Sequence, residues 1–136
     1  MPNNFFDGQL STARRLCILA GYIGTAMISL LSLAPATLRP HTGAGGGYEH
    51  WVAYALVGLA FGLGYETFRK RAMTGLALST GSAVLELLQS FVPGRNPEVI
   101  GFLSSSFGSF AGVSLAALTV FAFRALTGGA RRRGEM

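Results

Sequence analysis

Four long apolar stretches, separated by short polar or glycine-rich links, dominate this sequence. They cover about residues 16–33, 51–65, 72–92 and 102–123. A helix needs roughly 20 such residues to cross a hydrocarbon core of ~30 Å. The stretches are continuous rather than alternating or amphipathic, so they favour membrane spans over the core of a soluble domain. The predicted fold class is therefore all-α, a polytopic transmembrane bundle of about four helices.

The composition strengthens this interpretation. Half of the 136 residues are hydrophobic and 12% are charged, whereas a soluble domain carries about 25% charged residues. The net charge of +5 comes from basic residues that mostly flank the apolar stretches, with no basic-groove motif beside them, so we expect no nucleic-acid partner. The single cysteine, Cys17, excludes a disulfide or a CxxC site within one chain. We expect no metal and no cofactor.

The positive charges also predict the orientation. Basic residues are concentrated before the first stretch, between the second and third, and after the fourth. Short basic loops stay in the cytoplasm. We therefore expect a multi-pass protein of the cell (inner, cytoplasmic) membrane with both termini inside. Its parts are a cytoplasmic segment 1–15, a four-helix membrane domain 16–124 and a basic cytoplasmic tail 125–136.

The first stretch has a second interpretation, as a secretory signal. Arg14 and Arg15 would form its charged region, and Ala34-Pro35-Ala36 resembles a cleavage site. The apolar run of about 18 residues is longer than the usual signal core of 7–15 residues, however. We expect a retained helix, and cleavage stays the alternative.

Polar residues of the third stretch share one helical face. Ser79, Ser82, Glu86 and Gln89 follow one another at spacings of three, four and three residues. An ionisable group at membrane depth is costly and is functional by default, so this face should point into the bundle. Small residues on the neighbouring stretches predict close helix packing; they are Gly58, Gly62, Gly101, Ser105, Gly108 and Gly112.

The predicted topology brings several polar side chains to the outer leaflet. The candidate ligand-binding residues are His50, Tyr54, Glu86, Gln89 and Arg95. Three interpretations of Glu86 stay open: a protonated structural carboxyl bonded to Gln89 or a serine, a partner of Arg95 or His50 in a ligand site, or a snorkelling side chain. Arg95 is either a helix-end anchor or a clamp for phosphate or carboxylate.

These residues resemble the VanZ-like membrane family. The resemblance rests on three motifs: His50-x-x-x-Tyr54, Glu86-x-x-Gln89-x-Phe91-Val92-Pro93-Gly94-Arg95, and Gly108-x-x-x-Gly112. It covers about residues 46–115. It implies a small polytopic helical membrane protein, of a family whose named members are associated with low-level resistance to teicoplanin-type glycopeptide antibiotics.

The chain departs from the family pattern at two places. The family often has an Asp-Lys pair where this chain reads Gly46-Gly47, and an Asp followed by an Asn where it has Gly101 and Ser105. Glu98 offers a displaced carboxylate. If the family's chemistry requires the missing Asp and Asn, this chain binds the same kind of ligand without acting on it.

Two functions follow from this pattern. The first is recognition of membrane lipids at the outer leaflet, specifically an anionic or sugar-bearing envelope lipid or lipid-linked precursor, or a modulation of glycopeptide susceptibility. The alternative is a membrane hydrolase or transferase with Glu86 as general acid or base, His50 as relay and Arg95 as electrostatic stabiliser. The sequence shows no nucleophile motif for an enzyme, and a transporter is a weaker third interpretation. Whether the protein is an enzyme, and its oligomeric state, stay open.

Overall fold

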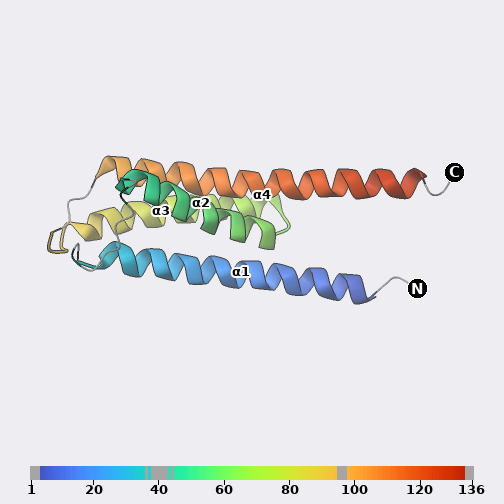
Figure 1. Cartoon of the computed structure of the whole chain (residues 1–136), viewed down its shortest axis with the longest axis horizontal. Coiled ribbons are helices and arrows are strands. Elements are labelled where there is room, and N and C mark those ends of the chain that lie inside the picture. The colour runs from blue at the N-terminus through green and yellow to red at the C-terminus, as the bar shows by residue number, and fades with distance from the viewer. Residues whose placement is uncertain (1–3, 36, 38–42, 44, 95–97, 134–136) are drawn as a thin grey trace.

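The computed structural model describes residues 4–35, 37, 43, 45–94 and 98–133. In this part of the chain all regular structure is helical. The helices are α1 (Asn4–Leu33), α2 (Gly46–Gly64), α3 (Phe68–Gln89) and α4 (Val99–Arg133). Consecutive helices run in opposite directions, so both termini lie at one end of the bundle (Figure 1). We call this end, with the α2–α3 link, the basic end, and the opposite one, with the α3–α4 turn, the turn end.

Two of the four helices are long and apolar enough to cross a membrane. They are the Leu10–Leu33 part of α1 and the Val99–Thr127 part of α4. α2 has only 19 residues and carries Glu49 and His50 in its first turns. α3 has three basic residues directly after Phe68, and Glu86 and Gln89 near its end. The expected all-helical fold is therefore confirmed, and a length and hydropathy sufficient for spanning is shown for α1 and α4.

Large apolar side chains cover much of the outside of the bundle. They face outward on all four helices, for example Leu30 at 73%, Leu87 at 68% and Phe107 at 69% exposure. Inside, a small apolar core around Tyr54 and Phe61 lies with three almost completely buried serines, Ser82, Ser105 and Ser109. Extensive exposed apolar surface marks a surface that meets apolar surroundings, and small residues inside are the packing device of helices in lipid.

The seam between α2 and α4 is the most extensive contact in the bundle, and glycines make it possible. A Cβ at Gly58 would lie 2.6 Å from the carbonyl oxygen of Ser109. Across the seam, Gly108 and Gly112 lie against the carbonyl oxygens of Trp51 and Ala55. No larger residue fits at these positions without moving a backbone, so the predicted close packing of small residues is confirmed.

Sequence signals at both ends of α3 set its length. At its start, Thr67 accepts a hydrogen bond from the backbone N–H of Lys70 at 3.3 Å, as an N-cap residue does. At its end, the chain tightens into i→i+3 bonds and turns at Gly94, whose φ is 74°. α3 therefore ends just before the Pro93-Gly94 turn.

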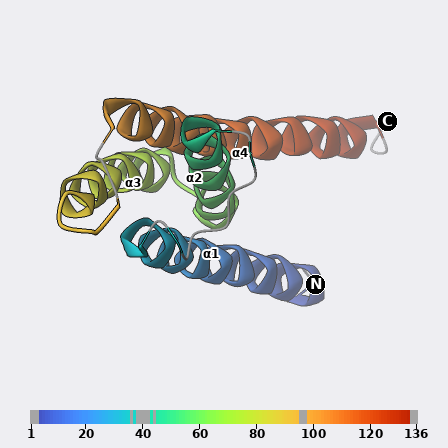
Figure 2. The same cartoon turned by 60° about the vertical axis from the view of Figure 1, so that its left-hand side comes forward.

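The polar face of α3 points into the bundle, as predicted. Ser82, Glu86 and Gln89 are buried, and the hydroxyl of Ser79 shares a hydrogen bond of 2.8 Å with that of Ser106 on α4. Figure 2 shows α2 between α1 and α4, with α3 beside them. The last turns of α3 therefore lie at the turn end, next to the beginning of α4 (Figure 1).

Candidate functional site

Glu86 holds the beginning of α4. Its side chain is 9% exposed. Its Oε2 accepts a hydrogen bond of 3.1 Å from the backbone N–H of Glu98, the residue before α4, and its Oε1 lies against Gly101. A helix N-terminus has unpaired N–H groups and a partial positive charge, so a carboxylate is stabilised there. This backbone N–H is a partner that none of the three interpretations left open for Glu86 had named.

Two buried polar atoms near Glu86 lack a hydrogen-bond partner among the described residues. They are the amide nitrogen Nε2 of Gln89, whose residue is 4% exposed, and the hydroxyl of Ser105, whose residue is 1% exposed. Gln89 follows Glu86 by one turn of α3, and Ser105 follows Gly101 by one turn of α4. An unpaired buried polar group costs about 1–3 kcal/mol. Neither atom therefore contributes a hydrogen bond to the fold among the described residues.

His50 and Tyr54 bring α2 to the same end. Their rings stack with centroids 6.5 Å apart and an angle of 29° between planes. Tyr54 is 3% exposed. Four of the five predicted residues therefore lie at the turn end, and Arg95 lies outside the described residues.

A groove of about 690 Å³ runs between α1 and α3, with Tyr54 among its lining residues. Its lining is mostly apolar, as at Ile28 and Leu78. The hydroxyls that α1 contributes already bond their own helix backbone, at 2.8 and 2.9 Å. Along α3 the groove extends from Met73 to Leu85, a rise of about 18 Å at 1.5 Å per residue. It therefore ends one residue before Glu86.

We call His50, Tyr54, Glu86, Gln89 and Ser105 the outer cluster. Ser105 is the member that the sequence did not single out as a ligand-binding residue, because its spacing from Gly101 and Gly108 is typical of packing. The groove has no sequence signal either, since it depends on how far apart α1 and α3 lie. Both features come from tertiary packing alone.

The side chains of the outer cluster can donate and accept hydrogen bonds. Within the described parts of the chain, no group of three or more His, Cys, Asp or Glu side chains lies close enough to hold a metal ion.

Comparison with known protein families, curated proteins and solved structures finds no match for this chain. The resemblance to the VanZ-like family therefore stays a prediction.

Proposed function

We propose that this chain is a VanZ-like, multi-pass protein of the cell membrane that binds an anionic or sugar-bearing envelope lipid at its outer leaflet. Both termini then lie in the cytoplasm, and the turn end, with the outer cluster, faces outward. In this role Gln89, Ser105 and Tyr54 give directional hydrogen bonds, Arg95 holds a phosphate or carboxylate, and Glu86 fixes the turn that carries Arg95. Sequestering a wall precursor, or a drug that targets one, would change glycopeptide susceptibility.

The unpartnered amide nitrogen of Gln89 carries this proposal. An amide NH₂ only donates, so its natural partner is an oxygen acceptor. Phosphate and sugar oxygens are such acceptors. Because Gln89 is 4% exposed and Ser105 is 1% exposed, a bound head group would satisfy both groups away from water, where hydrogen bonds are stronger.

The groove between α1 and α3 supports a lipid as the ligand. Its length of about 18 Å along α3 compares with about 15 Å for one leaflet of a ~30 Å hydrocarbon core. Along the axis of α3 it ends at the level of Glu86, and Tyr54 belongs to both groove and cluster. A lipid chain in the groove would place its head group at the cluster.

The enzymatic alternative has less support. A general acid or base must reach its substrate, whereas Oε2 of Glu86 accepts a hydrogen bond from the N–H of Glu98 and its Oε1 lies against the Cα side of Gly101. Catalysis through Glu86 would require it to leave the beginning of α4. Conversion of a lipid-linked substrate to product, lost in Glu86→Gln, would favour the enzyme over the binding protein.

Native mass spectrometry in mild detergent tests the proposal. We expect wild type to retain a lipid of defined mass, and Gln89→Leu and Arg95→Ala to retain it at least about tenfold less, as expected for the loss of one strong hydrogen bond. Ser82→Ala is the control, because Ser82 is equally buried but bonds the carbonyl of Ser79 in its own helix. Identical spectra for all four proteins would refute the outer site.

A further inference from the structure

Arg71 is a buried arginine at the basic end, far from the outer cluster. It lies in the first turn of α3 and is 9% exposed. Its Nε donates a hydrogen bond of 2.8 Å to the carbonyl oxygen of Gly62, in the last turn of α2. The last carbonyls of a helix have no partner within it. This bond therefore caps α2 and fixes the plane of the guanidinium.

Two more arginines, from other helices, act on Arg71 through their charge. Burial lowers the pKa of the Arg71 guanidinium, and the charges of Arg124 on α4 and Arg14 on α1 lower it further. The position of Arg14 is fixed independently: its carbonyl oxygen lies 3.0 Å from where a Cβ of Gly64 would be. Three helices thus bring like charges together, although the residues lie up to 110 positions apart in the sequence.

The charge at this place is only partly balanced. Among the described side chains, the ion pair formed here joins Arg14 to Glu66, in the α2–α3 link. Both partners are partly exposed, at 37% and 57%. One carboxylate is therefore paired here, while three guanidinium groups interact through their like charges. A bound anion would offset this repulsion.

We propose that Arg14, Arg71 and Arg124, the arginine cluster, bind the phosphate group of an anionic membrane lipid. Guanidinium groups match phosphate in geometry and bind it through two parallel N–H donors. The cluster lies where the apolar parts of α3 and α4 end, which is the level of a lipid head group. Anionic lipids of the cytoplasmic leaflet attract basic residues at this depth.

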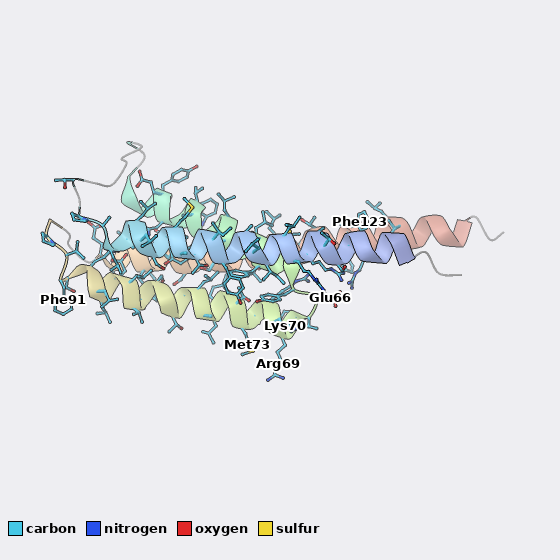
Figure 3. All side chains as sticks on the ribbon, turned by 90° about the horizontal axis from the view of Figure 1, so that it is seen from below. Glu66, Arg69, Lys70, Met73, Phe91 and Phe123 are labelled. Atoms are coloured by element: carbon cyan, nitrogen blue, oxygen red, sulfur yellow. The ribbon has the colours of Figure 1, made fainter. Side chains whose placement is uncertain are left out.

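The neighbouring basic residues provide a matched control. Figure 3 shows Arg69 pointing away from the bundle. It lies two residues before Arg71 in the same helical turn but outside the cluster. Lys70 lies 6.0 Å from the centre of the Tyr65 ring. A change at Arg69 therefore removes the same charge from the same helix without touching the proposed site.

The test compares lipid binding by variants of the full chain in mild detergent, by native mass spectrometry with added phosphatidylglycerol or phosphatidylcholine. We expect Arg71→Gln and Arg124→Gln to weaken phosphatidylglycerol binding about tenfold each, and Arg69→Gln to change it less than about twofold. Arg124 is exposed, so its variant decides the matter if Arg71→Gln fails to fold. Equal weakening by Arg69→Gln, or equal binding of both lipids, would overturn the proposal.

Glu66→Gln should change the affinity for phosphatidylglycerol in the opposite direction. It releases Arg14 from its ion pair, so we expect tighter binding of phosphatidylglycerol; weaker binding would overturn the arrangement. A further arm adds inorganic phosphate. If phosphate displaces the lipid, the free anion itself is a ligand of the cluster, and if it does not, the ligand is the lipid head group. Because the arginine cluster and the outer cluster lie at opposite ends, variants of each separate the two proposals.

Discussion

At the scale of single residues, the outer cluster combines one satisfied and two unsatisfied polar groups. Glu86 is bonded to the N–H before α4, whereas Gln89 Nε2 and Ser105 Oγ lack partners among the described residues. A protein gains no stability from such groups. Sites of this kind are retained where function opposes stability, which is the situation that a ligand-binding site creates.

Two serines of α4 test this difference directly. Ser105 and Ser109 are both fully buried, but only Ser109 donates a hydrogen bond, of 2.8 Å, to the carbonyl of Ser105. We expect Ser109→Ala to destabilise the protein by about 0.5–1.5 kcal/mol and Ser105→Ala to be neutral or stabilising. Thermal unfolding of delipidated protein in detergent measures both. A larger loss in Ser105→Ala would show that its hydroxyl is already bonded.

Gly101 is linked to Glu86 by contact. A Cβ at this position would collide with Oε1 of Glu86. We expect Gly101→Ala to displace that carboxylate from the beginning of α4, and so to lower the retention of lipid at the outer cluster. Gly47→Ala is a milder control at the same end, since its Cβ would meet the hydroxyl of Ser104 at 3.2 Å. Unchanged retention in Gly101→Ala would separate Glu86 from ligand binding.

At the scale of helices, α3 packs unevenly against its neighbours. It contacts α4 extensively and α1 sparsely, which leaves the groove. Gly81 lines that groove, and a Cβ built on it meets nothing within 4 Å. A large side chain can therefore enter the groove from this position without displacing a helix.

Gly81→Phe tests the groove as the seat of a lipid chain. We expect the variant to fold normally and to retain at least about tenfold less lipid. The phenyl ring would displace a few methylene groups of the lipid chain from the groove, and the loss of their buried apolar contact weakens binding by about that factor. Retention by native mass spectrometry is the measurement, and Gly81→Ala is the control. Full retention by Gly81→Phe would place the lipid chain elsewhere.

Substitutions in the glycine seam between α2 and α4 should destabilise the protein, unlike substitutions at Gly81. A Cβ at Gly108 collides with the backbone of Trp51, whereas one at Gly81 enters open space. We expect Gly108→Ala to destabilise the protein by about 1–3 kcal/mol through overpacking. Gly81→Ala should stabilise it by about 0.5–1 kcal/mol through helix propensity. Thermal unfolding of both variants gives the sign of each effect; equal effects would contradict the close approach of α2 and α4.

At the scale of the whole molecule, the four helices place both termini and the α2–α3 link at one end (Figure 1). Figure 3 shows the same polarity, with Phe91 at one end and Lys70 and Arg69 toward the other. Because basic loops resist translocation, the basic end should face the cytoplasm.

Cysteine labelling checks this orientation. In a Cys17→Ala background, we expect Ser90→Cys to react with a membrane-impermeant maleimide in intact cells, since the turn end faces outward. Thr127→Cys should react only after permeabilisation. Both positions are exposed. Reaction of Thr127→Cys in intact cells would invert the orientation and place the arginine cluster outside.

The sequence predicts those structural features that depend on neighbouring residues of one helix, and not those that depend on contacts between helices. Hydropathy and charge are carried by each residue, so the number and order of the helices, the stop after α3 and the inward face of Ser82, Glu86 and Gln89 follow from the chain itself. The boundaries were less predictable, because α1 begins at Asn4 and α4 continues to Arg133, beyond their apolar stretches. The residues on either side of an apolar stretch can continue the helix, so the helix is longer than the stretch that hydropathy identifies.

The tertiary structure alone decides which groups meet. It gives Glu86 the N–H of Glu98 as its partner, leaves Gln89 Nε2 and Ser105 Oγ without one among the described residues, and lets the charges of Arg124 and Arg14 act on Arg71. Such pairings join residues from different helices, and their geometry depends on helix separation and rotation. The periodicity of residues along one helix predicts neither the separation nor the rotation of helices. It predicts which face of the helix points inward, but not which residues of other helices that face contacts.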